Sequence, residues 1–227
     1  MNKFMGKKVN KMKENLSELV FIIDKSGSMH SLTADTIGGF NSMLESQKKE
    51  DGDAFVTTVL FDTEYKVFQD HVNIKDARFM TDVDYVPGGM TALLDALGYA
   101  IDSVGKRLAE TPEEERPENV IFTIITDGLE NSSKEYTKSV VKEKIEHQQS
   151  KYSWKFVFLG ANMDAVKEAG GLGIQGAYAR GYTCSKKGLD SAYKGMSMAV
   201  GVVRKRKSYK SEEEFEMAVC DSLDKIE

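Results

Sequence analysis

An apolar run that ends in one acid and two hydroxyls is the part of this chain best suited to chemistry. Residues 19–23 read Leu-Val-Phe-Ile-Ile, and Asp24, Ser26 and Ser28 follow at alternate positions around Gly27. A strand over 19–24 would leave one carboxylate and two hydroxyls on a tight loop at its carboxyl end. Oxygen donors of this kind suit a hard cation such as Mg²⁺ or Mn²⁺, and they suit zinc or copper poorly.

Two later segments offer further oxygens. A second buried-looking strand over residues 119–126 is followed by Asp127, and residues 87–91 form the glycine-rich stretch Pro-Gly-Gly-Met-Thr before a predicted helix. Taken singly, each residue has another interpretation, since hydroxyls and acids also serve as turn or helix-cap residues. Taken together, they predict a metal site whose ligands are Asp24, Ser26, Ser28, Thr91 and Asp127.

The order D-x-S-x-S, then Thr, then Asp resembles the metal-ion-dependent adhesion site of von Willebrand factor A (VWA) domains, and the resemblance covers about residues 17–205. It implies a bound Mg²⁺ or Mn²⁺, with Thr91 and Asp127 alternating between direct and water-mediated contact. It also implies a protein partner that supplies a carboxylate to the open coordination position. The intracellular bacterial members are the most similar, which implies work beside an ATPase-linked or stress-resistance complex.

Helices and strands alternate along the chain and must position these ligands. Besides the two strands already named, we expect strands at 54–61, 64–69, 154–159 and 176–181. Amphipathic helices are expected at 33–48, 91–109, 133–149, 163–169 and 185–204, with a short final helix after Ser211. Ser132 with Glu135, and Ser211 with Glu214, form capping-box patterns at two helix starts.

This alternation predicts an α/β fold, a doubly wound three-layer sandwich around a mostly parallel six-stranded sheet. Ligands in such folds lie outside the carboxyl ends of the strands, where Asp24 and Asp127 are expected. The connection through Asp62 and Thr63 is too tight for a crossover, so strands two and three must be antiparallel. The VWA resemblance adds the strand order 3-2-1-4-5-6 and the description Rossmann-like.

Three regions are expected: a basic flexible arm over 1–16, the VWA-like domain over 17–205, and a helical extension over 206–227 packed on or beside it. The chain has 227 residues, a formal charge of −5 and only two cysteines, Cys184 and Cys220. These features predict a cytoplasmic protein without a membrane span, a disulfide framework or a nucleic-acid partner.

The interpretation favoured by the residues is a non-catalytic, metal-dependent protein–protein interaction module. The alternative is a metal-dependent hydrolase or phosphatase that uses Asp24 as nucleophile or a metal-activated water. Against it, no base is paired with a nucleophile, and position 26 is Ser where a haloacid-dehalogenase pattern requires a second acid. A third interpretation, in which the metal only stabilises the fold, predicts a closed site.

Overall fold

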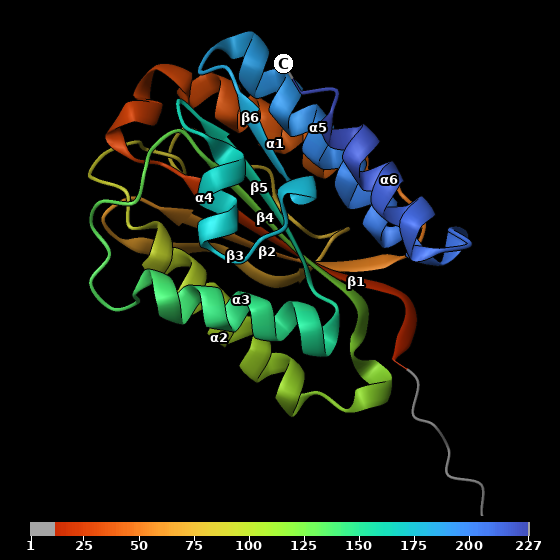
Figure 1. The fold of residues 1–227 in the computed structure, drawn as a ribbon. Coiled ribbons are helices and arrows are strands. Elements are labelled where there is room, and N and C mark those ends of the chain that lie inside the picture. The colour runs from red at the N-terminus through yellow and green to blue at the C-terminus, as the bar shows by residue number, and fades with distance from the viewer. Residues whose placement is uncertain (1–11, 227) are drawn as a thin grey trace, which may run out of the picture.

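One six-stranded sheet runs through residues 12–226, the part of the chain that the computed structural model describes (Figure 1). Its spatial order is β3-β2-β1-β4-β5-β6, and every neighbouring pair is parallel except β2 and β3. The predicted strand order and the antiparallel third strand are therefore confirmed. The strands are β1 (Lys13–Asp24), β2 (Asp53–Phe61), β3 (Tyr65–Asn73), β4 (Pro117–Thr126), β5 (Lys155–Ala161) and β6 (Ala179–Tyr182).

Helices cover both faces of this sheet and complete the predicted three-layer sandwich. In Figure 1, α2 and α3 lie side by side on one face, α1 and α5 lie on the other, and α6 lies beside α5. Within residues 12–226, no helix combines the length and apolar character needed to cross a bilayer. The α-helices are α1 (Thr33–Lys48), α2 (Leu93–Glu110), α3 (Lys138–Tyr152), α4 (Ala165–Gly171), α5 (Lys186–Arg204) and α6 (Glu212–Leu223). The 3₁₀ turns are η1 (Gly27–Leu32), η2 (Glu113–Glu115), η3 (Gly176–Tyr178) and η4 (Arg206–Ser208).

The two central strands of the sheet, β1 and β4, are its most deeply buried part. Residues 16–24 of β1 are all buried, as are residues 119–126 of β4, because helices cover the sheet on both sides. The predicted apolar stripe of α2, which includes Leu97, Ile101 and Val104, is buried against this sheet. Burial on both faces holds the carboxyl ends of β1 and β4 next to each other.

The start of β1 differs from the expectation. The strand begins at Lys13, inside the range expected for the basic arm, and Lys13 N donates to Arg116 O at 2.9 Å. Backbone pairing with the start of β4 extends the strand through exposed polar residues, and an apolar pattern cannot predict such an extension. Of the expected arm, residues 1–11 lie outside the described part of the chain.

The helix expected at 133–149 is also shifted, and its predicted capping box does not form. The α3 helix begins at Lys138, and the side chain of its N-cap residue Thr137 accepts from Val140 N. Two carboxylates bind the backbone N–H groups that precede this helix. Glu130 accepts from the N–H groups of residues 132 and 133, and Asp95 accepts from those of residues 134–136. These two carboxylates hold residues 128–137 as a loop.

The carboxyl-terminal residues form a helix whose predicted cap is present. Ser211 Oγ accepts from Glu214 N at 3.1 Å, and the Glu214 carboxylate accepts from Lys210 N at 2.9 Å. Phe215, Val219 and Leu223 of α6 are buried in the same core as the sheet. The end of the described chain is thus packed against α5.

Candidate metal centre

The ends of β1 and β4 bring four of the five expected ligands into one hydrogen-bonded group. Ser26 Oγ lies 3.1 Å from Ser28 Oγ, and Ser28 Oγ donates to Asp127 Oδ1 at 2.6 Å. The Asp24 carboxylate, which is fully buried, accepts from Ser26 N at 2.7 Å. Residues almost a hundred positions apart therefore converge because β1 and β4 are parallel neighbours.

The glycine-rich loop is tied to the first loop by its backbone. Gly27 N donates to Gly89 O at 3.1 Å, and Gly88 N donates to Lys25 O at 2.9 Å. Gly89 has a φ of +68°, and a Cβ there would lie 2.7 Å from Thr63 Oγ1, so the position requires glycine. These contacts fix where the following residue, Thr91, enters the site.

Thr91 is buried against the β4 loop. Its backbone exchanges two hydrogen bonds with Asn131, at 2.9 Å and 3.0 Å, and a Cβ on Gly128 would lie 3.0 Å from Thr91 Oγ1. The alternative interpretation of Thr91 as a helix cap is wrong, because the N-cap of α2 is Ala92 and makes no side-chain bond. The Thr91 hydroxyl forms no hydrogen bond within residues 12–226 and is free to bind a ligand.

Asp24 is the buried acid of the group. Burial is the main cause that raises the pKa of Asp24 to about 6, and the nearby Asp127 raises it further. Hydrogen bonds from Thr126 and Ser26 oppose that shift without cancelling it. The free-energy cost of ionising Asp24 in this place would be offset by a bound cation.

The donor set fits a hard divalent ion. All five expected side chains offer oxygen: two are carboxylates and three are neutral hydroxyls. Mg²⁺ accepts ligands of this kind. Among the described residues, no group of three or more His, Cys, Asp or Glu side chains is placed to hold a metal. That absence is consistent with this donor set, because it contains only two acids.

Polar residues near these loops have structural roles around the site. Asp164 caps α4 by accepting from Lys167 N at 3.0 Å, and Asp62 pairs with Lys25. Glu130 accepts from Leu94 N at 2.9 Å and so links the β4 loop to the start of α2. His30, which follows the first loop, is exposed.

Three supporting residues are not predicted from the sequence pattern. The Thr126 hydroxyl donates to Asp24 Oδ2 at 2.5 Å, and Tyr85 OH donates to the Asp24 carbonyl at 2.6 Å. Tyr182 OH donates to Thr126 O at 3.3 Å. The only sequence signal is the position of Thr126 directly before Asp127, since Tyr85 and Tyr182 arrive from distant segments.

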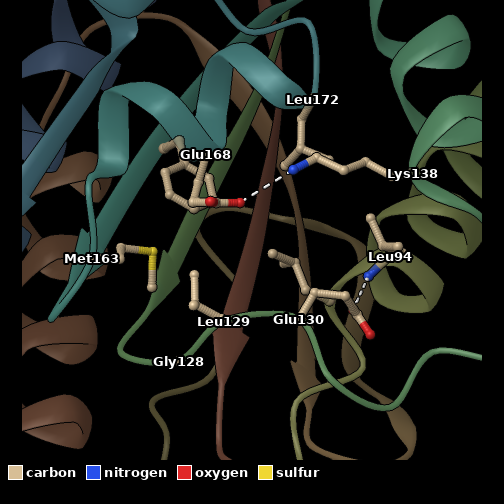
Figure 2. Close-up of a pocket in the computed structure, with 10 residues that line it drawn as sticks. Leu94, Gly128, Leu129, Glu130, Lys138, Met163, Glu168 and Leu172 are labelled. Atoms are coloured by element: carbon tan, nitrogen blue, oxygen red, sulfur yellow. Dashed lines mark hydrogen bonds and ion pairs between the residues drawn. The ribbon is translucent and has the colours of Figure 1, made fainter.

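A small hollow lies beside the β4 loop, between α2 and α4. It has a volume of about 30 Å³, and Figure 2 shows Leu129 and Met163 on its wall with the Lys138–Glu168 ion pair at one side. The Leu129 side chain is itself exposed. The candidate metal centre is thus bordered by apolar surface.

A buried polar cluster at the other end of β1 also went unpredicted. The fully buried Glu18 carboxylate accepts from Thr57 Oγ1 at 3.1 Å, lies 2.9 Å from His71 Nδ1, and pairs with Arg107 Nη2 at 3.3 Å. Its partners come from β2, β3 and α2. The cluster satisfies one charged residue in the buried part of β1 and lies away from the candidate ligands.

No protein-family model matches the chain, and no curated protein matches its sequence significantly. Solved structures do match its fold, beginning with proximal thread matrix protein 1 from the mussel byssus, at a TM-score of 0.57 and 14% identity over 86% of this chain and 48% of that one. Another structure of that protein, with a zinc-occupied metal-ion-dependent adhesion site, matches at a TM-score of 0.56 and 12% identity over 83% and 48% of the two chains.

Two bacterial structures also match. A von Willebrand factor type A protein from Catenulispora acidiphila has a TM-score of 0.51 and 18% identity over 82% of this chain and 42% of its own. The pilus adhesin SpaC from Lactobacillus rhamnosus GG has a TM-score of 0.63 and 10% identity over 85% and 31% of the two chains. The chain spans less than half the length of each of these four structures. It shares the fold of von Willebrand factor type A domains.

Proposed function

We propose that this chain is a divalent-metal-dependent protein–protein interaction module. Asp24, Ser26, Ser28, Thr91 and Asp127 would hold Mg²⁺ or Mn²⁺, and the ligand recognised would be an Asp or Glu side chain of a partner protein. The observation that carries this proposal is the 2.6 Å bond from Ser28 to Asp127, which joins the β1 loop to the β4 loop, while backbone bonds tie the glycine-rich loop to the β1 loop. The zinc-occupied adhesion site of the structurally similar mussel protein supports a divalent ion at this edge of the sheet.

The bound ion would supply a positive charge that attracts one more anionic oxygen. The five donors of this chain would leave one of the six positions that Mg²⁺ prefers open for that oxygen. Asp24 is turned toward the site by the Ser26 amide and the Thr126 hydroxyl. The exposed side chains of Met90 and Leu129, which flank two of the loops, would contact apolar atoms around the partner's acid.

We further propose that the module is non-catalytic and acts in a reducing compartment. Both cysteines are free, and Cys184 Sγ lies 4.0 Å from Asp127 Oδ2, where oxidation would disturb the site. The serine hydroxyls of the first loop bond to each other and to the two acids of the site, and no His or Lys in the described structure is bonded to them. Partners within an ATPase-linked or stress-resistance complex remain part of this proposal.

Two measurements test the proposal. Calorimetric titration with Mg²⁺ and Mn²⁺ should show one site in the wild type and none in Asp127→Ala. Affinity capture from the native cell lysate should then recover a partner with wild type in Mg²⁺, but not in EDTA or with Asp127→Ala. Asp164→Ala is the matched control, since it removes a strand-end acid that caps a helix outside the site. A partner recovered equally in all arms would refute the metal mechanism.

A further inference from the structure

A second and much larger hollow lies at the opposite end of the sheet from the candidate metal centre. Its volume is about 1000 Å³, and its walls are the last turns of α2 and α3, the start of β4 and the turn after α5. The metal loops follow the carboxyl end of β4, whereas the hollow is lined by its first residues, Pro117–Val120. A strand of 10 residues separates the two places, which is about 30 Å at 3.3 Å per residue.

The hollow has an apolar floor. Leu108, Val120 and Trp154 line it and are buried in the protein core. Trp154 stacks on Phe122 with ring centroids 5.3 Å apart, so its indole is held in place by β4. Only the edges of these side chains reach the hollow, and the exposed Tyr152 beside them adds the apolar area that a partner's side chain would contact.

The rim of the hollow is basic although the chain as a whole is acidic. Five Lys and Arg side chains line it against three Asp and Glu, an excess of two positive charges on a chain whose formal charge is −5. Lys207 is paired with Glu118, and Asp102 is paired with Lys144. Lys106 and Lys151 form no ion pair within residues 12–226, so their charge is available to an anionic partner.

One polar atom in the wall lacks a partner. Gln148 lines the hollow, and its Oε1 is buried without a hydrogen-bond donor. A buried carbonyl oxygen of this kind is costly to leave unpaired. The half-buried Gln148 side chain would have to turn so that Oε1 faces the hollow, where the N–H of a peptide backbone would supply the missing donor.

We propose that this hollow binds an acidic peptide segment that carries one apolar anchor residue. The anchor would lie on Leu108 and Trp154, a backbone N–H would reach Gln148, and flanking carboxylates would meet Lys106 and Lys151. The chain's own amino-terminal segment is not the occupant proposed, because residues 1–11 contain four Lys and no acid. The partner would therefore bind at one pole of the domain while the metal loops lie at the other.

Trp154 is the only tryptophan of the chain and reports directly on this site. The probes are capped pentapeptides with two glutamates on each side of Leu, Met or Phe, titrated in EDTA so that the metal loops cannot capture a carboxylate. At least one peptide should change the Trp154 emission saturably with a Kd below about 1 mM. The same peptides with lysine in place of glutamate should not bind.

Matched variants assign the effect to the hollow. Lys106→Glu with Lys151→Glu should weaken binding at least tenfold, whereas Lys167→Glu with Lys194→Glu makes the same charge change on exposed lysines of α4 and α5 and should leave it unchanged. Gln148→Leu should weaken it several-fold, and the melting temperature of each variant verifies folding.

The proposal is overturned if no peptide binds, or if both double variants weaken binding equally. It is also overturned if tripolyphosphate binds with the same lysine dependence and competes with the peptide, which would assign the hollow to small polyanions. Because every titration is done in EDTA, these outcomes are independent of the metal-dependent function proposed above.

Discussion

The Thr126 hydroxyl donates a 2.5 Å hydrogen bond to Asp24 Oδ2, from the last residue of β4 to the last residue of β1. The same hydroxyl accepts from Gly128 N at 3.2 Å. Thr126 therefore orients the buried carboxylate and the start of the β4 loop together, and it adds no charge to the site. Side chains that hold a ligand in this way tune the affinity of a metal site without touching the metal.

Replacing Thr126 with valine should lower the affinity for Mg²⁺ by about 10- to 100-fold, because Asp24 loses the bond that orients it. Isothermal titration calorimetry measures the change. Thr123→Val is the matched control, because that buried β4 hydroxyl bonds to Val20 O at 3.3 Å, away from the ligands. Similar affinity losses in the two variants would show that general strand packing, and not Asp24 orientation, is responsible.

Metal affinity should fall as the pH is lowered. Burial raises the pKa of Asp24 to about 6, so a proton competes with the cation below that value. From pH 7.5 to pH 5.0 the apparent affinity for Mg²⁺ should drop by about tenfold. Titrations at three pH values measure this dependence. An affinity that stays constant over the range would mean that Asp24 is already ionised at pH 5.

In EDTA, Asp24→Asn should stabilise the protein at pH 7.5. The folded pKa of about 6 lies above the ordinary aspartate value of 3.8, so the carboxyl group favours folding while protonated and that contribution is lost as the pH rises through 6. Asparagine stays neutral. The Thr126 hydroxyl can turn to donate to Gly128 O, 3.0 Å away, and its oxygen can then accept a hydrogen bond from the side-chain amide of the asparagine. The expected gain is about 1–2 kcal/mol.

Urea unfolding at pH 7.5 and pH 4.5 measures the effect of Asp24→Asn, which should shrink at the lower pH. Asp82→Asn, in an exposed loop, serves as the control and should change stability at neither pH. A destabilised Asp24→Asn protein at pH 7.5 would contradict the sign derived from the raised pKa.

Two adjacent glycines of α1 should respond oppositely to alanine. A Cβ on Gly39 would overlap the Tyr193 ring of α5, whereas a Cβ on Gly38 meets nothing within 4 Å. Gly39→Ala should cost about 1–3 kcal/mol through overpacking, and Gly38→Ala should gain up to about 1 kcal/mol of helix propensity. Chemical denaturation of both variants measures the difference. Equal effects would mean that α1 and α5 can separate at no cost.

Local sequence was sufficient for the elements and for the first ligands. Apolar runs, a tight Asp62–Thr63 connection and helical periodicity predicted the layers and the antiparallel third strand, which the structure confirms. Asp24, Ser26 and Ser28 are positioned within one loop, so their spacing alone indicates that they share a place. Asp127 and Thr91 lie far along the sequence: the parallel pairing of β1 and β4 brings Asp127 to that loop, and the glycine-rich loop places Thr91 beside Gly128.

The tertiary structure decided what depends on distant partners. Ser132 and Glu135 form a capping-box pattern, yet Glu130 and the remote Asp95 bind the amides of that segment and delay α3 to Lys138. Likewise, Glu18 lies in an apolar strand and is satisfied by His71 and Arg107 from other elements. A sequence pattern records which groups a segment offers. Which of them pair is set by long-range packing, because a buried polar group takes whatever partner the fold brings within hydrogen-bond distance.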